Sequence, residues 1–384
     1  MSAVRLRKKK KKGGGNLQPR KLRVIISGGG TGGHIFPAIA IANALKKMNS
    51  ANEFLFVGAL GRMEMEKVPS AGYKIEGLNI SGIQRKFSLK NFLLPFKIIK
   101  SVLKAKSIIK NFSPDVAIGV GGYASGPLLY AATSMKIPAL IQEQNSFAGI
   151  TNKILSKRVQ KICVAFENMS RFFPEMKLVM TGNPVRDEMV RIEGKKQEAI
   201  NFFGLDANKK TVLVIGGSLG ARTINESIEA GLQKINDSGI QLIWQTGKTF
   251  GPKAMQLINS LNTKNIVTFE FIQRMDYAFA AADLIISRAG ASSVSELALI
   301  GKPVILVPSP NVAEEHQTKN AMALVTKNAA TLVTDDEAKK ELINKMFEIF
   351  SNDALQKSLS ENIRKLAIND SADKIANEVY KIAK

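Results

Sequence analysis

The chain has 384 residues, 45% of them hydrophobic and 23% charged, and its formal net charge is +23. That length exceeds what one hydrophobic core usually serves, so two domains are expected, and the composition excludes a disordered chain. The sequence lacks the run of about 18 apolar residues that a membrane-spanning helix needs, and its cationic start lacks the apolar stretch of a signal peptide, which favours a cytoplasmic location.

Cysteine and histidine are scarce. Cys163 is the only cysteine, so no internal disulfide can form, as expected in a reducing compartment. The two histidines are His34 and His316, and together with one cysteine they are too few for a typical zinc site. Zinc binding is therefore not expected.

Positive charge is concentrated at the amino terminus. Nine basic residues lie within the first 21 positions, in a low-complexity stretch whose residues 1–20 are expected to form a disordered tail. Subtracting these nine charges from +23 leaves +14 for the rest of the chain. The folded body is therefore basic, and an anionic partner is expected: a nucleic acid, a phosphorylated small molecule or a membrane surface.

From Lys21 onward, short apolar runs alternate with helical patterns. The run LRVIISGGG predicts a buried strand that ends in a glycine turn, and HIFPAIAIANALKKM predicts the helix behind it. Near-continuous apolar strands separated by helices are typical of a parallel sheet covered on both faces. Further strands of this kind are predicted at 53–58, 115–122, 138–144, 161–166 and 177–186.

The pattern begins again after a polar, charged connection over 187–210. Residues 211–235 repeat the order of strand, glycine turn and helix, and QLIWQTG, NIVTFEFI, DLIISRAG and KPVILVPSP predict the strands that follow. Two doubly wound α/β domains side by side are the simplest architecture with this repeat.

Glycine-rich turns follow predicted strands at four places. The first, SGGGTGGHIFPA at 27–38, contains the pattern G-x-G-x-x-G. Glycine allows positive φ and a close approach of ligand to backbone, while free N–H groups at a helix start favour an anion. A single glycine turn can be explained as a tight connection between a strand and a helix. Four such turns at equivalent places instead favour a phosphate-bearing ligand between the domains. The other three lie at 119–127, 215–222 and 287–303.

A nicotinamide dinucleotide is not the favoured ligand. A dinucleotide site needs an acid at the end of the second strand, where it binds the ribose. Glu53 has nearly the right offset, but it stands at the start of EFLFVG rather than at its end. This position argues against a dehydrogenase.

Glu296 lies in the first turns of the helix predicted after the turn at 287–303. Its carboxylate could cap backbone donors of that helix. Alternatively, the carboxylate accepts both hydroxyls of a ribose, which suits a group that only accepts hydrogen bonds.

Seven motifs occur in the order found in one enzyme family: GGTGGHIFPAIAIA, GGYASGP, QEQN, TGNPVR, GGSLGAR, SRAGASSVSELALIGKPVILVP and EEHQTKNA. From about Leu22 to the carboxyl end, the chain resembles the MurG family of peptidoglycan transferases. These enzymes move N-acetylglucosamine (GlcNAc) from UDP-GlcNAc to the 4-hydroxyl of the muramic acid in lipid I, the undecaprenyl-linked muramyl-pentapeptide, and so form lipid II. The basic tail lies outside this pattern.

The resemblance implies the GT-B fold, in which two Rossmann-like domains face each other across a cleft. The first would span 21–186 and the second 187–368, with a last helix at 369–384 that returns to the first domain. The resemblance further implies a metal-independent, inverting hexosyltransferase with no cofactor, which holds its donor mainly in the second domain. It also implies peripheral attachment to the cytoplasmic side of the inner membrane.

The resemblance also implies roles for single residues. Ser218 and the amides of GGSLGAR would bind the diphosphate, Glu296 the ribose, and the backbone of Ile272 the uracil, while Gln317 would read the sugar hydroxyls. Where the family often has GGSQGA, this chain has Leu219, which removes one possible polar contact. The other residues expected in the substrate site are Asn145, Arg186, Thr31, Gly32 and Gly33.

Transfer of the sugar requires a group that stabilises charge and a group that accepts a proton. Charge develops on the leaving diphosphate, and the sequence contains no Asp-x-Asp pair to hold a divalent cation. Helix N-termini, with Arg222 or Arg288 nearby, are expected to take that role. His34 is the first candidate for the base that deprotonates the acceptor hydroxyl, and Glu143 is the second. Alternatively, His34 only donates a hydrogen bond to backbone or substrate.

A lipid-linked acceptor requires contact with the membrane. The stretch 77–114 has eight basic residues and no acidic one. Basic residues attract anionic lipids, and apolar side chains among them can insert at the interface. In the helix after Pro95, the side chains of Phe96, Ile99 and Leu103 are expected in the core. Contact with the anionic membrane is therefore predicted for the preceding residues Ile83, Arg85, Lys86, Phe87, Lys90, Phe92 and Leu93.

Three other functions compete with this interpretation. A UDP-sugar:diacylglycerol glycosyltransferase would share the fold and the membrane face, so only the family motifs select lipid I. A UDP-GlcNAc epimerase needs no membrane face, and the acid-free stretch argues against it. A nucleic-acid-binding protein would also be basic, but the sequence lacks the aromatic-rich strands of single-strand readers, so no nucleic acid is expected.

Overall fold

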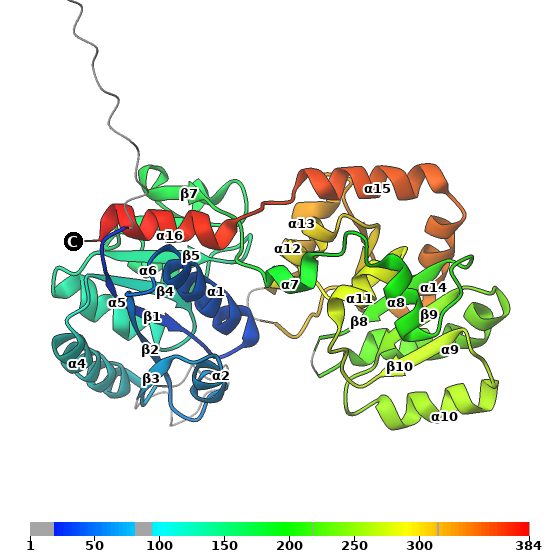
Figure 1. Cartoon of the computed structure of the whole chain (residues 1–384), viewed down its shortest axis with the longest axis horizontal. Helices are drawn as coiled ribbons and strands as arrows, with labels where there is room; N and C mark the ends of the chain where they lie inside the picture. Colours follow the sequence, from blue (N-terminus) through cyan, green and yellow to red (C-terminus); the bar gives the residue numbers. More distant parts are fainter. Residues whose placement is uncertain (1–18, 81–93, 218, 313–314, 384) are drawn as a thin grey trace, which may run out of the picture.

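The computed structural model describes residues 19–80, 94–217, 219–312 and 315–383. The predicted tail up to residue 18 lies outside the described residues, as do Ser218 and the predicted membrane contacts between Ile83 and Leu93. Two parallel sheets with helices on both faces form two separate domains (Figure 1). The predicted doubly wound α/β architecture is therefore confirmed.

The first sheet has the spatial order β3-β2-β1-β4-β5-β6-β7, and every pairing is parallel. Its strands are β1 (Arg23–Gly28), β2 (Glu53–Ala59), β3 (Lys74–Leu78), β4 (Val116–Gly121), β5 (Ala139–Glu143), β6 (Lys161–Val164) and β7 (Leu178–Met180). Its helices are α1 (Gly32–Met48), α2 (Glu64–Ser70), α4 (Leu94–Phe112), α5 (Ser125–Ser134) and α6 (Ile150–Leu155), with 3-10 turns at Met169–Arg171 and Glu175–Lys177.

The second sheet has the corresponding order β10-β9-β8-β11-β12-β13, again parallel. Its strands are β8 (Thr211–Ile215), β9 (Gln241–Gln245), β10 (Ile266–Phe269), β11 (Leu284–Ser287), β12 (Val304–Leu306) and β13 (Thr331–Leu332). The helices from the connection onward are α7 (Asp187–Val190), α8 (Lys196–Phe203), α9 (Arg222–Asp237), α10 (Gly251–Leu261), α11 (Met275–Ala281), α12 (Ala291–Ile300), α13 (His316–Val325), α14 (Ala338–Phe350), α15 (Asp353–Lys365) and α16 (Ser371–Ile382).

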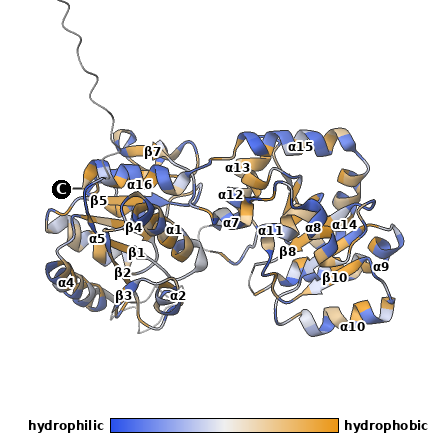
Figure 2. Cartoon of the chain, viewed as in Figure 1, coloured by the Kyte–Doolittle hydropathy of each residue, from blue (hydrophilic) through white to orange (hydrophobic). Residues whose placement is uncertain are grey.

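The central strands are apolar at successive positions because both faces of each sheet are covered. In β1, Val24 and Ile26 belong to the core layer under α1, whereas Ile25 belongs to the layer under α4 and α5. Successive side chains of a strand point to opposite faces, so an uninterrupted apolar run is needed to fill both layers. Figure 2 shows hydrophobic strands enclosed by helices whose outer surfaces are largely hydrophilic.

The last helix, α16, packs on the first domain although it follows the second in sequence (Figure 1). Ile375, Ala376 and Val379 are buried in the same core layer as β1 and α1. The hydroxyl of Tyr380 accepts a hydrogen bond of 2.8 Å from the Asn52 side chain. The chain therefore crosses between the domains twice, at the connection before α8 and again before α16.

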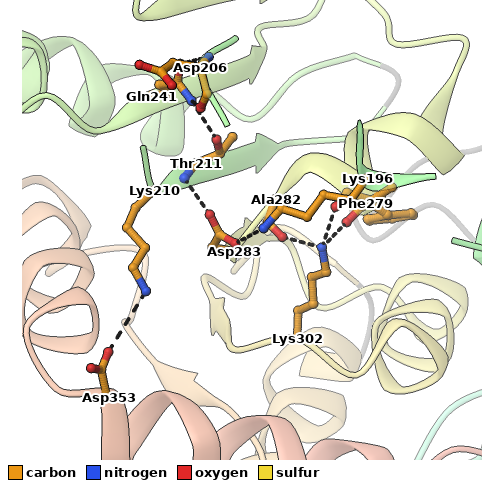
Figure 3. A network of polar contacts seen from close by, with 11 residues as sticks. Lys196, Asp206, Lys210, Thr211, Gln241, Phe279, Ala282, Asp283, Lys302 and Asp353 are labelled. Carbon is orange, nitrogen blue, oxygen red and sulfur yellow. Dashed lines mark hydrogen bonds and ion pairs between the residues drawn. The ribbon is translucent and has the colours of Figure 1, made fainter. Parts of the chain in front are cut away.

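The amino-terminal edge of the second sheet is closed by polar contacts (Figure 3). Asp283 accepts from the Thr211 N–H and from Lys196, at 2.9 and 3.0 Å. The Lys302 ammonium donates to three carbonyls at the end of α11, those of Phe279, Ala280 and Ala282. Since these donors and acceptors satisfy one another, this edge has a structural role, and the opposite, carboxyl edge is the one open to a ligand.

Helix α4 differs from the sequence prediction. Phe96, Ile99 and Leu103 are 66%, 58% and 60% exposed, so their predicted place in the core is wrong. The buried face of α4 is instead formed by Ser101, Ala105, Ile108 and Ile109. Positions 103 and 105 differ by about 200° around a helix, so only one of the two apolar stripes can face the sheet. No helix among the described residues is both long and apolar enough to cross a bilayer.

Candidate functional site

A cleft of about 790 Å³ lies between the two domains at the carboxyl edges of both sheets. In each sheet the strand order reverses between its two central strands, β1 and β4 in the first and β8 and β11 in the second. Ligands of doubly wound folds bind at such reversal points. The four predicted glycine turns follow these four strands, and those after β1, β8 and β11 contribute residues to the wall of the cleft.

The predicted site residues divide into two groups. Those that line the cleft are Gly32, Gly33, Arg186, Ile272, Glu296 and Gln317. Those that the structure describes but that do not line it are Thr31, His34, Glu143 and Asn145. Ser218 lies outside the described residues, but its neighbours Gly217 and Gly220 belong to the wall.

The described part of the glycine turn in the second domain opens toward the cleft. Gly217 and Gly220 have positive φ, and a side chain at Gly220 would come within 2.2 Å of the Thr246 carbonyl oxygen, so glycine is required there. Helix α9 begins directly after this turn, at Arg222. Its first N–H groups carry the positive end of the helix dipole into the cleft, which suits a phosphate.

The glycine turn of the first domain already holds an anion of its own. The buried carboxylate of Glu64 accepts from the N–H of Gly30 at 2.8 Å and from the N–H of Ala59 at 3.0 Å. A side chain at Gly29 would come within 2.2 Å of that carboxylate. The G-x-G-x-x-G pattern therefore binds an internal carboxylate here.

Both arginines expected near the anion have acidic partners. Arg222 is largely exposed and donates to Glu226 at 2.7 Å. Arg288 pairs with Asp335, whose other oxygen accepts from the Thr223 hydroxyl at 2.8 Å. Because their charges are compensated, the helix N–H groups are the main uncompensated positive feature that we find in this part of the cleft.

Glu296 faces the cleft from α12 in a largely buried position. Burial raises the pKa of this carboxyl to about 7, although Arg186 opposes the shift from 3.9 Å away. The guanidinium of Arg186 also stacks 4.9 Å from the ring centre of Phe36 in the first domain. This carboxyl is therefore poised to lose its proton when hydrogen-bond donors approach it.

Gln245 is a cleft residue that the sequence prediction did not identify. Its amide oxygen accepts from the Ile272 N–H at 3.1 Å, and its amide nitrogen donates to the Gly217 carbonyl at 2.9 Å. It thereby holds the loop at 271–273 beside the glycine turn. Its position at the end of a predicted strand was the available signal. Gln317 is fixed in a similar way, because its side-chain oxygen accepts from the Ser309 N–H at 2.9 Å.

His34 packs against the backbone at the end of β4. A side chain at Gly121 would lie 2.7 Å from the imidazole ring, which explains the glycine. The ring nitrogen Nδ1 lies 2.9 Å from the side-chain oxygen of Gln144. Burial lowers the pKa of His34 below its ordinary value, although nearby Glu143 acts to raise it. Burial therefore favours the neutral form of the imidazole.

Glu143 is buried and accepts four hydrogen bonds. They come from the backbone N–H groups of Asn145 and Gly149 and from the side chains of Asn145 and Asn152, at 2.8 to 3.3 Å. Both carboxylate oxygens are thereby occupied by the loop that follows β5. This arrangement makes Glu143 a support of that loop and favours His34 as the base.

Two asparagines join the domains around Gly290, the residue before α12. The Asn183 side chain donates to the Ala291 carbonyl and to the Ser295 hydroxyl, at 3.3 and 3.0 Å. The Asn320 side chain donates to the Ala289 carbonyl and to Asn145, at 3.3 and 3.2 Å. The predicted substrate residue Asn145 thus forms part of the domain junction.

We found no group of three or more His, Cys, Asp or Glu side chains arranged to hold a metal ion among the described residues.

Two family descriptions match the sequence, "Glycosyltransferase family 28 N-terminal domain" over residues 24–164 and "Glycosyltransferase family 28 C-terminal domain" over residues 211–378.

Curated relatives are similar over nearly their full length. The UDP-N-acetylglucosamine--N-acetylmuramyl-(pentapeptide) pyrophosphoryl-undecaprenol N-acetylglucosamine transferase of Parabacteroides distasonis is 56% identical, over 94% of this chain and 99% of the relative. The protein of the same name from Flavobacterium psychrophilum is 51% identical, over 94% of this chain and 97% of the relative.

Solved structures agree with this relationship. The crystal structure of Acinetobacter baumannii MurG superposes with a TM-score of 0.77 at 28% identity, covering 94% of this chain and 100% of that chain. A UDP-GlcNAc 2-epimerase from Neisseria meningitidis, bound to UDP-GlcNAc, has a TM-score of 0.65 at 17% identity, over 94% and 100% of the chains, and this likeness concerns the fold alone. The predicted GT-B fold is confirmed.

The titration of Glu296 tests the electrostatics of the cleft. We expect its carboxyl to lose the proton with a midpoint near pH 7, and the Arg186→Met variant to titrate at higher pH because the opposing positive charge is gone. The carboxyl bands in difference infrared spectra between the wild type and Glu296→Gln measure this directly. An ordinary carboxyl midpoint near 4.3, unaffected by Arg186→Met, would contradict the described environment.

Proposed function

Because this chain belongs to glycosyltransferase family 28, we propose that it transfers GlcNAc from UDP-GlcNAc to lipid I and so forms lipid II for peptidoglycan. The observation that carries the proposal is the 56% identity to a relative named for this transfer, over 94% of the chain. The cleft supports it independently, since it combines an anion site, a poised carboxyl and a nearby neutral imidazole.

The donor lies along the second domain. The diphosphate binds at the N-terminus of α9, with Ser218 and the amides of its turn, and the ribose hydroxyls donate to Glu296. The backbone of Ile272 contacts uracil through its carbonyl oxygen, because its N–H already donates to Gln245. Gln317 forms hydrogen bonds with the sugar hydroxyls, and Arg186 contacts the donor from the domain junction.

Departure of UDP leaves negative charge on the diphosphate. The fixed N–H groups of α9 are directed at that position before the reaction begins, so no reorganisation is needed when the charge develops. We propose that they take the part that a divalent cation plays in other transferases, which makes the transfer independent of metal.

The acceptor hydroxyl attacks the anomeric carbon from the face opposite UDP, and the configuration inverts. The new bond forms between the acceptor oxygen and the anomeric carbon as the bond to the UDP oxygen breaks. His34 takes the hydroxyl proton on Nε2, since its Nδ1 faces the oxygen of Gln144. Thr31, Gly32 and Gly33 begin α1 beside this histidine and border the acceptor.

Lipid I brings the first domain to the membrane. Phe96, Ile99 and Leu103 form an exposed stripe on α4, which we call the α4 stripe, and Lys97, Lys100 and Lys104 lie beside it in sequence. Apolar insertion combined with attraction to anionic lipid gives reversible binding at a surface. We propose peripheral attachment to the cytoplasmic side of the inner membrane through this stripe and the preceding residues 83–93.

An assay with a panel of acceptors tests the proposed reaction. Labelled UDP-GlcNAc is incubated with lipid I, with diacylglycerol or with no acceptor, each in the presence and absence of a chelator. We expect label only in lipid II, at a rate that the chelator leaves unchanged. Labelling of diacylglycerol alone would assign a different acceptor, and loss of transfer with the chelator would refute the metal-independent mechanism.

Replacement of His34 tests the assignment of the base. The His34→Ala variant should lose turnover by about a hundredfold or more at saturating UDP-GlcNAc, because the group that we propose accepts the proton is removed. In the wild type, kcat should fall only below about pH 6.5, since burial lowers the pKa of this histidine. Near-normal turnover of His34→Ala would remove His34 from this role.

The α4 stripe is tested with vesicles. Changing Phe96, Ile99 and Leu103 to Ser should reduce sedimentation with anionic vesicles by about tenfold or more, because apolar area is lost at the interface. The triple variant should keep its fold, since the wild-type side chains are exposed. Changing the exposed Phe202 of α8 to Ser is the matched control. Equal binding of all three proteins, or of neutral and anionic vesicles, would contradict this surface.

A further inference from the structure

A chain of buried amides runs from His34 in the first domain to α12 in the second. Gln144 contacts the imidazole, Gln142 contacts Gln144, and Asn183 contacts Gln142 and helix α12. The three amide side chains are at most 2% exposed. The reaction proposed above assigns them no step, and buried polar groups of this kind are costly unless they are fully paired.

Backbone carbonyls determine which way each amide points. The Gln144 side chain lies 2.7 Å from the Val120 carbonyl oxygen and 3.2 Å from that of Gln142. A carbonyl oxygen can only accept, so the amide nitrogen of Gln144 must face these two groups. The amide oxygen of Gln144 must then face Nδ1 of His34, 2.9 Å away.

The next two amides follow from the same rule. The Asn183 nitrogen donates to the carbonyls of Gln144 and Ala291, at 3.0 and 3.3 Å, so its oxygen faces Gln142. That oxygen accepts from the Gln142 nitrogen at 2.9 Å, and the Gln142 oxygen accepts from Gln144. Reversal of any one amide would place two acceptors or two donors face to face.

This order of donors and acceptors determines which ring nitrogen of His34 carries the hydrogen. Because the Gln144 oxygen only accepts, Nδ1 must carry a hydrogen, and in the neutral ring the lone pair is then on Nε2. We propose that Gln144 is a positioning residue, which holds His34 as the Nδ1–H tautomer and so leaves Nε2 free to accept a proton. This inference rests on the proposed function, since it concerns the base assigned there.

The same hydrogen-bonded amides also connect the base to the junction of the two domains. Asn183 binds α12 through Ala291 and Ser295, and α12 carries Glu296 at the donor site. If the domains separated at this point, Asn183 would lose two of the acceptors that orient it. The hydrogen-bonded amides that end at His34 therefore begin at the helix that carries a donor-site residue.

The tautomer can be measured without substrate, because the protein has only two histidines. Imidazole nitrogen NMR on protein with labelled histidine distinguishes Nδ1–H from Nε2–H, and a His316→Gln variant assigns the two rings. Above the ordinary histidine pKa of about 6.5, we expect the His34 ring to be Nδ1–H in the wild type. Gln144→Met should weaken this preference, because the side-chain acceptor that faces Nδ1 is then gone.

Kinetics with both substrates form the second measurement. Gln144→Met should lower kcat by roughly 10- to 100-fold with little change in the KM for UDP-GlcNAc. Gln241→Met is the matched control, because Gln241 is a buried glutamine with three hydrogen bonds at the far edge of the second sheet. Its kcat and its His34 tautomer should be unchanged.

The outcomes separate this inference from the proposed function. An Nε2–H ring in the wild type, or an unchanged tautomer in Gln144→Met, would overturn the inference and leave the transferase proposal standing. A changed tautomer with kcat within twofold of the wild type would overturn it as well. Absence of transfer to any acceptor in the wild type would refute the transferase proposal, while the NMR result would still decide whether Gln144 sets the tautomer.

Discussion

Two buried asparagine side chains, Asn183 and Asn320, join the two domains of this protein through their hydrogen bonds. The carbonyls of Ala289 and Ala291, on either side of Gly290 just before α12, accept from Asn320 and Asn183. The same asparagines bind the segment after β5, at Ser146 and Gln144. A buried amide that lost such partners would cost about 1–3 kcal/mol. These two amides therefore help to hold the domains in the arrangement that forms the cleft.

The two glycine turns show how similar local sequences serve different ends. In the first domain the buried carboxylate of Glu64 occupies the N–H of Gly30, and the turn is complete without a ligand. In the second domain the turn opens on the N-terminus of α9, whose neighbouring arginines are already paired with acids. This asymmetry supports our proposal that the second domain binds the phosphates and that α1, with His34 near its start, faces the acceptor.

Backbone requirements made much of the fold predictable. The strands could be predicted because both faces of each sheet are covered, and the glycine turns because a side chain at Gly121 or Gly220 would collide with neighbouring atoms. The α4 stripe was mispredicted, since periodicity alone cannot decide which of two apolar stripes packs inward. Gln144 and Gln245 were not identified, because an amide gains its role from the carbonyls that orient it, and these come from distant segments.

The most direct test of the account is a crystal structure with UDP-GlcNAc bound. The account predicts uracil against the loop at 271–273, ribose hydroxyls on Glu296 and the diphosphate at the N-terminus of α9 with no cation between them. It also predicts that Asn183 keeps its bonds to α12 while Nδ1 of His34 stays on Gln144. A nucleotide outside this cleft, or a diphosphate held through a metal ion on protein carboxylates, would contradict it.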